Sequence, residues 1–284
     1  MDVIREASAL TRTTGEWRDA GAVVGLVPTM GALHDGHASL IERARDGADR
    51  VVVTIFVNPA QFGPGEDLAA YPREEDRDLE RCRRLGVDAV WAPPEEEVYP
   101  PGVALPEPDP GPVGETFEGA ARPGHFHGVL KVVHRLFDVT GPCRACFGEK
   151  DAQQLFLVRR MVRELDLPVE IVPCPTVRAP DGLAASSRNA RLTADEREQA
   201  GCLFLALTEA AALARAGERS APVLVAAMTR EIGATPLARL DHAAVVDDAT
   251  FTAIDRLAGG PARAIVAARF PSARLIDNLL LPTG

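Results

Sequence analysis

Two histidines at a spacing of three, His34 and His37, lie in segment 28–41, whose sequence is PTMGALHDGHASLI. An apolar run ends at Pro28, and a helical pattern begins near Gly36. We therefore expect both imidazoles between the carboxyl end of a buried strand and the amino end of a helix, where unpaired N–H groups and the positive helix end favour phosphate. Because that helix end disfavours an imidazolium, at least one ring is expected to be neutral and to donate from one nitrogen.

The histidine pair alone does not decide the function. Histidines at this spacing also occur incidentally or as part of a metal site, but zinc needs a third ligand nearby, and none is evident in the sequence. Gly31 and Gly36 favour the phosphate interpretation, because a glycine lets the backbone approach a ligand closely.

Segment 56–73, FVNPAQFGPGEDLAAYPR, also follows an apolar run. Asn58 and Gln61 can hydrogen-bond a carboxylate or a hydroxyl, while Phe62 and Tyr71 can wall a small apolar pocket. A turn that uses asparagine for its geometry is an equally good interpretation of Asn58, and both remain open.

Segment 147–161, FGEKDAQQLFLVRRM, places Lys150 and Asp151 at a turn between a strand that ends at Gly148 and a helix near Gln154. The lysine is a point charge suited to phosphate oxygens, and the aspartate can bind a ribose hydroxyl. A lysine at the amino end of a helix is electrostatically misplaced unless an anion binds there.

Segment 184–192, AASSRNARL, brings together two hydroxyls and a guanidinium, from Ser186, Ser187 and Arg188. Such a set can clamp a phosphate, and its place between two predicted domains suggests a loop that closes over substrate. A capped surface loop is the competing interpretation. Segment 122–129, RPGHFHGV, adds Arg122, His125 and His127.

The elements that must position these residues alternate between strands and helices. Apolar runs predict strands over 22–27, 51–57, 87–92, 144–148 and 169–174, and helical spacing predicts helices over 37–48, 74–86, 128–140 and 151–166. Nearly continuous apolar strands separated by helices indicate a Rossmann-like, doubly wound parallel α/β fold. Segment 93–124 is rich in Pro and Gly, which predicts a long loop or lid.

The pattern changes after residue 175. Helices are expected over 193–217, with a capping box of Thr193 and Glu196, and over 221–233. Short apolar runs follow, so we predict a smaller α+β domain with antiparallel strands. The domains are expected to be 1–175, which binds nucleotide and substrate, and 176–284, which closes over the nucleotide.

Composition narrows the function classes. The 284 residues are 46% hydrophobic, 25% charged and 5% aromatic, which fits a globular chain and excludes a collagenous or disulfide-scaffold class. The net charge of −10 argues against nucleic-acid binding, and no run approaches the roughly 18 apolar residues of a membrane span. Five scattered cysteines fit a reducing, cytoplasmic compartment. A metal or redox role for Cys143 and Cys146 is disfavoured, because a lone C-x-x-C is a weak signal.

Seven motifs occur together in one order along the chain: PTMGALHDGH, FVNPAQF with EDLAAYPR, RPGHFHGV, FGEKDAQQ, PTVR, SSRN and LIDN. With them the chain resembles the pantoate–β-alanine ligase (pantothenate synthetase) family, within the H-x-G-H nucleotidylyltransferases. The resemblance spans most of the chain. It implies ATP and Mg²⁺ as cofactors, (R)-pantoate and β-alanine as substrates, a homodimer, a cytoplasmic location and a Rossmann-like amino-terminal domain that also binds pantoate.

The family's reaction has two steps. The pantoate carboxylate attacks the α-phosphate of ATP to give pantoyl adenylate and pyrophosphate, and the amine of β-alanine then displaces AMP. Carried over by position, the resemblance implies catalytic roles for His37, His34, Lys150 and Arg188. It implies ATP contacts for Met30, Gly31, Ala32, Leu33, His34, Asp35, Gly36, His37, Gly148, Glu149, Lys150, Asp151, Val177, Ala185, Ser186, Ser187 and Arg188. It implies contacts with pantoate or β-alanine for Gln61, Gln154, Asn58 and Phe62. It assigns no residue as a Mg²⁺ ligand.

Three positions depart from the family's pattern: Ala185 replaces a common Met, Ala152 a frequent aromatic residue and Arg191 a usual Tyr. They concern loop packing more than chemistry, because Ser186, Ser187, Arg188 and Asn189 are intact. Two other functions remain open: an H-x-G-H transferase that ends at a nucleotide conjugate, and a nucleotide-binding regulator that releases no pyrophosphate.

Overall fold

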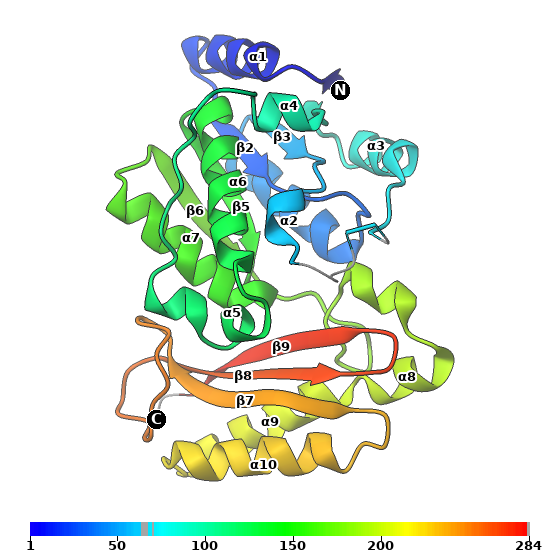
Figure 1. The fold of residues 1–284 in the computed structure, drawn as a ribbon, viewed down its shortest axis with the longest axis vertical. Helices are drawn as coiled ribbons and strands as arrows, with labels where there is room; N and C mark the ends of the chain where they lie inside the picture. The colour runs from blue at the N-terminus through cyan, green and yellow to red at the C-terminus, as the bar shows by residue number, and fades with distance from the viewer. Residues whose placement is uncertain (64–67, 70, 283–284) are drawn as a thin grey trace. The chain divides into compact units, whose positions relative to one another are not determined.

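The structure is a computed structural model that describes residues 1–63, 68–69 and 71–282 (Figure 1). The chain divides into two compact units. The first comprises Met1–Glu149 and Gln153–Pro175, and the second comprises Lys150–Ala152 and Thr176–Gly284. The division at residue 175 matches the predicted domains 1–175 and 176–284, except that Lys150–Ala152 group by their contacts with the carboxyl-terminal part of the chain.

The first unit is built on a six-stranded sheet whose neighbouring strands are parallel, in the order β1-β4-β3-β2-β5-β6. The strands are β1 (Asp2–Ile4), β2 (Val24–Val27), β3 (Arg50–Thr54), β4 (Ala89–Trp91), β5 (Cys143–Gly148) and β6 (Val169–Cys174). The prediction of a doubly wound α/β fold is confirmed. Strand β1 and helix α1 (Ala7–Asp19) were not predicted, because β1 is too short to show a pattern.

Helices cover both faces of this sheet. Val52 of β3 packs in a cluster with residues of α1, α6 (His125–Thr140) and α7 (Ala152–Glu164). Val51 and Val53 pack in a second cluster with α2 (Asp35–Gly47) and α3 (Glu75–Arg84). Neighbouring residues of a strand point to opposite faces of the sheet. Because helices bury both faces, both sets of side chains are apolar, which explains the continuous apolar runs in the sequence. The predicted buried face of α2 is confirmed at Leu40, Ile41 and Ala44.

The long segment 93–124 contains short helices: α4 (Glu95–Val98), η2 (Pro112–Glu115) and α5 (Glu118–Ala121). Three of the segments predicted to carry chemistry, 28–41, 56–73 and 147–161, lie at the carboxyl ends of β2, β3 and β5. In the sheet, β2 lies between β3 and β5. The strand order reverses between β2 and β5, and ligands of open α/β sheets bind at the carboxyl ends of strands beside such a point.

The second unit has an antiparallel sheet of β7 (Arg239–Asp247), β8 (Ala262–Arg269) and β9 (Arg274–Leu281) (Figure 1). Helices α9 (Cys202–Arg215) and α10 (Ala221–Gly233) share its apolar core. The helix predicted over 193–217 is divided, because α8 (Ala194–Gln199) ends before α9 begins. Its capping box is confirmed: Thr193 Oγ1 accepts from the Glu196 N–H, and Glu196 Oε2 accepts from the Thr193 N–H.

Across the part of the chain that the structure describes, we find no helix with the length and apolar character that a bilayer crossing requires.

All five cysteines are buried free thiols. Burial raises the pKa of the Cys143 thiol to about 12, which disfavours the reactive thiolate.

Candidate active site

The loop from β2 to α2 is held in shape by a buried carboxylate. Gly31 and Ala32 have φ angles of 80° and 50°, and the N–H groups of Ala32 and Leu33 each donate to Asp78 of α3 over 2.8 Å. Asp78 is only 2% exposed. Burial raises its pKa, although the Leu33 and Ala32 N–H groups act in the opposite direction. The loop that carries both histidines therefore depends on a residue from another helix.

His34 and His37 form a reciprocal cap at the amino end of α2. The Gly36 N–H donates to His34 Nδ1 over 3.1 Å, and the His34 N–H donates to His37 Nδ1 over 3.3 Å. The ring centroids lie 4.0 Å apart. An Nδ1 that accepts a hydrogen bond cannot carry a proton, so this geometry gives each neutral ring its proton on Nε2.

The turn after β3 is held mainly by Asn58. Its Oδ1 accepts from the Ala60 N–H at 3.2 Å and from the Tyr99 hydroxyl at 2.7 Å. Its Nδ2 donates to Gly128 O and to Gln61 Oε1, and the residue is 1% exposed. This geometry favours the turn interpretation of Asn58, because its amide hydrogen bonds are made within the protein.

Gln61 joins two of the predicted segments, since its Nε2 lies 3.0 Å from Met30 Sδ. Its main-chain carbonyl is held by His125 Nδ1 at 2.9 Å, and His125 Nε2 lies 2.8 Å from Arg122 Nη1. A guanidinium only donates, so Nε2 of His125 accepts and Nδ1 donates to Gln61. His125 and Arg122 thus support this turn, while His127 is exposed.

Phe62 and Tyr71 make an edge-to-face contact with ring centroids 6.1 Å apart, which fits the predicted apolar wall. Glu66, Asp67 and Ala70 of the EDLAAYPR motif lie outside the described residues. In the first turn of α7, Gln154 is partly buried. Its neighbour Gln153 is buried and binds the 113–118 segment through Val113 O, Thr116 O and the Glu118 N–H.

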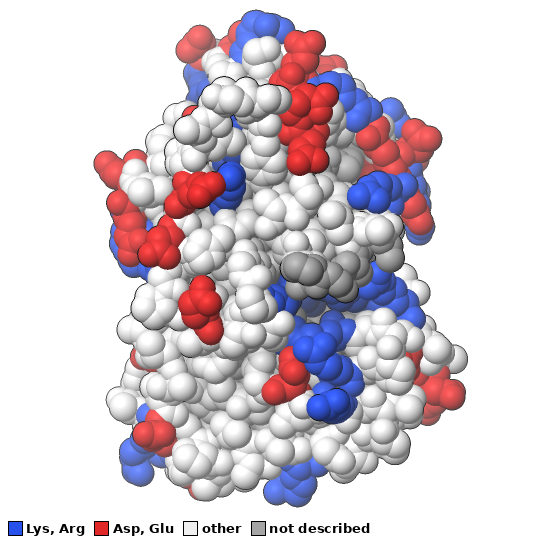
Figure 2. All heavy atoms as spheres, in the orientation of Figure 1, with Lys and Arg blue, Asp and Glu red and all other residues white. Residues whose placement is uncertain are grey.

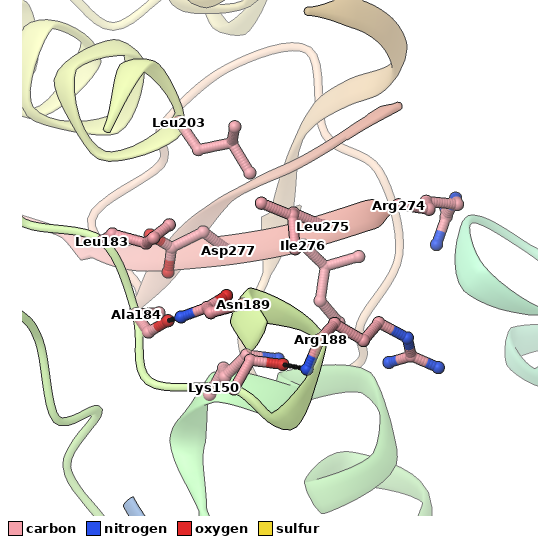
Figure 3. A pocket seen from close by; sticks show the side chains of 11 residues that line it. Lys150, Leu183, Ala184, Arg188, Asn189, Leu203, Arg274, Leu275, Ile276 and Asp277 are labelled. Atoms are coloured by element: carbon pink, nitrogen blue, oxygen red, sulfur yellow. Dashed lines mark hydrogen bonds between the residues drawn. The ribbon is translucent and has the colours of Figure 1, made fainter. Parts of the chain in front are cut away.

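The second unit has a small pocket lined by cationic, polar and apolar side chains (Figure 3). Its lining is Lys150, Leu183, Ala184, Ser186, Arg188, Asn189, Leu203, Arg274, Leu275, Ile276 and Asp277. The Lys150 side chain is 17% exposed, and its Nζ lies 3.4 Å from Asp151 Oδ1, a long contact for an ion pair. The one carboxylate in this lining, from Asp277, is bound by both terminal nitrogens of Arg178. Positive charge therefore dominates the pocket.

Local hydrogen bonds shape the predicted phosphate clamp. Ser186 caps the short helix η4 (Ser187–Arg191) by accepting from the Arg188 N–H at 3.2 Å. Asn189 Nδ2 donates to Ala184 O over 2.9 Å. Figure 3 marks this hydrogen bond with a dashed line. The Ala185 N–H donates to Val177 O at 2.9 Å, so two separate predicted site residues pair through their backbones.

Arginines also line up across the antiparallel sheet. Arg239 pairs in register with Arg269, and Arg269 with Arg274, while Asp241 accepts hydrogen bonds from Arg274 and Arg269. Figure 2 shows basic side chains gathered over this sheet. In a chain with a net charge of −10, this is a local concentration of positive charge beside the pocket that Arg274 helps to line.

The model of one protein family, described as pantoate-beta-alanine ligase, matches residues 2–280. The chain belongs to the pantoate–β-alanine ligase family. Pantothenate synthetase from Rubrobacter xylanophilus is 52% identical and covers 98% of this chain and 97% of its own. Pantothenate synthetase from Roseiflexus castenholzii is also 52% identical, and the match covers 95% of this chain and 98% of its own. The family resemblance inferred from the motifs is thus confirmed.

Solved structures of pantoate–β-alanine ligases share this fold. Pantothenate synthetase from Thermus thermophilus superposes with a TM-score of 0.91 at 45% identity, over 99% of this chain and 100% of that one. The ligase from Francisella tularensis, complexed with beta-gamma ATP and β-alanine, superposes with a TM-score of 0.79 at 32% identity. The match covers 100% of this chain and 99% of that one.

In this ligase, replacing Asp78 with asparagine is expected to weaken both stability and turnover. An amide offers one acceptor atom to two N–H donors and turns its own NH₂ group toward one of them. The free energy of unfolding should fall by about 1–3 kcal/mol, the cost of a buried unsatisfied group. Chemical denaturation and steady-state kinetics measure the two effects. Asp76→Asn, an exposed position on the same helix, is the matched control. Unchanged stability and turnover in Asp78→Asn would refute this role.

Proposed function

We propose that this ligase condenses (R)-pantoate with β-alanine at the expense of ATP, giving pantothenate, AMP and pyrophosphate through an enclosed pantoyl adenylate. The observation that carries the proposal is the reciprocal cap of His34 and His37, which assigns each ring proton to Nε2 at the amino end of α2. Two neutral imidazole donors at a helix end suit an anionic phosphate chain. The complex of the Francisella tularensis relative with beta-gamma ATP supports a nucleotide substrate.

The first step needs stabilisation of negative charge more than covalent help from the protein. The pantoate carboxylate attacks the α-phosphorus, the bond to the bridging oxygen breaks, and pyrophosphate leaves. Two anions must approach each other, so donors on the phosphate oxygens lower the barrier. We assign this role to His37 and His34 in the first unit and to Lys150 and Arg188 in the second.

The remaining nucleotide contacts follow the motifs. In the first unit we assign them to the loop from Met30 to His37 and to Gly148 and Glu149. In the second unit we assign them to Asp151, Val177, Ala185, Ser186 and Ser187. The second unit is proposed to close over the bound nucleotide, which keeps water from hydrolysing the acyl adenylate.

Pantoate is proposed to bind through Gln61 and Gln154, with Phe62 against its apolar part, and β-alanine to bind near Gln61. The geometry gives Asn58 a positioning role, because its Nδ2 donates to Gln61 Oε1 and fixes the orientation of that amide. In the second step the β-alanine amine attacks the acyl carbon. AMP then leaves with the oxygen that came from the pantoate carboxylate.

Mg²⁺ is proposed to arrive with the ATP phosphates, where it would neutralise part of their charge. Within the described ranges there is no group of three or more His, Cys, Asp or Glu side chains that could hold a metal ion. Mg²⁺ is commonly bound by one or two carboxylates together with substrate phosphates, so the residues present fit a substrate-borne ion. We assign it no protein ligand.

A homodimer in the cytoplasm completes the proposal. Both properties are implied by the resemblance to the family, whose members shown here align over nearly their whole length. Sedimentation equilibrium at several concentrations of the purified enzyme tests the dimer directly. A single species at 30.3 kDa would contradict it.

Isotope labelling tests the proposed intermediate. With ATP, Mg²⁺ and pantoate but no β-alanine, the enzyme should exchange labelled pyrophosphate into ATP. After β-alanine is added, ¹⁸O from the pantoate carboxylate should appear in AMP, because that oxygen forms the bond to the α-phosphorus. Mass spectrometry of the nucleotide measures the label.

Omitting pantoate is the control, and it should abolish the exchange. ADP and phosphate as products, with the label in phosphate, would mean an acyl phosphate and would refute adenylation. A nucleotide conjugate as the end product would instead favour the other class of H-x-G-H transferase. Binding of ATP without release of pyrophosphate would favour a regulator.

A further inference from the structure

Lys150 lies in an unusual part of the chain. It belongs to the short turn η3 (Glu149–Asp151), between β5 and α7, and both of these elements lie almost wholly in the first unit. Lys150–Ala152 nevertheless group with the second unit. The turn therefore makes contacts with the second unit in addition to those with the neighbouring strand and helix.

One such contact comes from β9. Asn278 Nδ2 donates to the main-chain carbonyl of Lys150 over 2.8 Å. The two residues are 128 positions apart in the sequence, and Asn278 is 5% exposed. A partly buried hydrogen bond of this length restrains the backbone from which the lysine side chain extends.

The orientation of the Asn278 amide is set by an arginine. Arg263 Nη1 donates to Asn278 Oδ1 over 2.6 Å, and Arg263 Nε donates to Asp248 Oδ1 over 2.6 Å. Because a guanidinium has no acceptor, the oxygen of the amide must face Arg263. The NH₂ group then faces the Lys150 carbonyl, so the direction of the bond follows from chemistry.

A second arginine holds the backbone of Asn278. Arg178 donates to Asn278 O at 3.2 Å and binds both carboxylate oxygens of Asp277. The Asn278 N–H also donates to Asp277 Oδ1 at 2.8 Å. The PTVR and LIDN motifs thus form one buried polar network, and the Lys150 turn is attached to it.

We propose that Asn278 is a positioning residue for Lys150: held by Arg263 and Arg178, it attaches the phosphate-binding lysine to the second unit, so that the ammonium follows this unit and not the sheet from which it emerges. The inference rests on the proposed function, because it takes Lys150 as a phosphate contact. Asn278 itself acts only through the lysine and touches no substrate.

The test is a double-mutant cycle with Asn278→Asp and Lys150→Ala. Aspartate has the shape of asparagine and still accepts from Arg263, but it cannot donate to the Lys150 carbonyl. We expect kcat to fall between about tenfold and about 10²-fold in Asn278→Asp, the scale of a misplaced catalytic group. In the Lys150→Ala background the same substitution should leave kcat unchanged, because no ammonium remains to be positioned.

Thermal melting separates this role from a structural one. Lys150→Ala keeps the main-chain carbonyl, so Asn278→Asp should shift the melting temperature equally in both backgrounds while its effect on kcat disappears in one. Asn278→Ser, which adds no charge and is too short to reach the carbonyl, should give the same pattern if the aspartate variant does not fold. Asp248→Asn keeps an oxygen that can accept from Arg263 Nε, so the orientation of Asn278 is retained and kcat should change by less than about twofold.

The outcomes distinguish the inference from the function it rests on. Full turnover in Lys150→Ala alone would refute the role of the lysine, and the inference with it. Reduced turnover in Lys150→Ala, combined with unchanged kcat in Asn278→Asp, would refute only the positioning role. Effects on kcat that multiply in the double variant would also refute it, because they would show that Asn278 acts independently of the lysine.

Discussion

Lys150→Ala is expected to lower turnover by about 10² or more, the usual effect of removing one group that stabilises developing charge. Its side chain is 17% exposed in a pocket where positive charge dominates, and the distance of 3.4 Å to Asp151 Oδ1 leaves the charge weakly compensated. An anion is the partner that such an ammonium requires. Because the variant keeps the main-chain carbonyl that binds Asn278, the melting temperature should change little.

The chain provides a matched control, because it contains only one other lysine. Lys131 forms an ion pair with Glu107 and lies over the Tyr99 ring, with 5.7 Å from Nζ to the ring centroid. Lys131→Ala should keep turnover within about twofold of the parent enzyme, the expectation for an exposed ion pair. Steady-state kinetics and thermal melting of both variants give the comparison. Near-normal activity of Lys150→Ala would overturn its assignment to the phosphates.

The second large effect concerns His37. We expect His37→Ala to slow adenylate formation by about 10² or more, since it removes a donor from the phosphates. Capture of preformed pantoyl adenylate by β-alanine should be largely preserved, because pyrophosphate has already left and the second step takes place at the acyl carbon. Single-turnover kinetics started from ATP or from the adenylate measures the two steps separately. A parallel loss in both steps would contradict a role confined to the phosphates.

The cap allows a sharper comparison at the same position. A glutamate at the third position of a helix accepts from the N-cap N–H, as His37 Nδ1 does from His34. The melting temperature of His37→Glu should therefore be close to that of the parent enzyme, whereas His37→Ala loses the hydrogen bond from the His34 N–H. Its carboxylate should repel phosphate, so adenylation should be slower in the glutamate variant than in the alanine variant. Equal rates would mean that the histidine matters mainly as a cap.

Local patterns predicted much of the fold and some of the site. The apolar runs of β2 and β3, the buried face of α2 and the capping box at Thr193 are properties of neighbouring residues, so periodicity and capping rules found them. The placement of both histidines at the start of α2 follows in the same way.

The missed features depend on contacts between distant segments. Asp78 is 46 positions from Ala32, and its helix looks like an ordinary charged helix in sequence. The hydrogen bonds of Asn58 to Tyr99 and Gly128 join residues 41 and 70 positions away, so its burial could not be predicted locally. The same holds for Asn278, which lies in a short apolar run. Paired polar groups of this kind leave no periodic signal.

The grouping of Lys150–Ala152 with Thr176–Gly284 means that the backbone passes from one unit to the other three times, after Glu149, after Ala152 and after Pro175. The second unit is therefore not a contiguous module. A fragment that begins at Thr176 would carry Ser186, Ser187 and Arg188 without the lysine. Recombination between relatives at Pro175 would likewise inherit Asn278 from one parent and the turn that it binds from the other. Exchange of the carboxyl-terminal part therefore keeps Asn278 and the Lys150 turn from the same parent only when residues 150–152 are transferred with it.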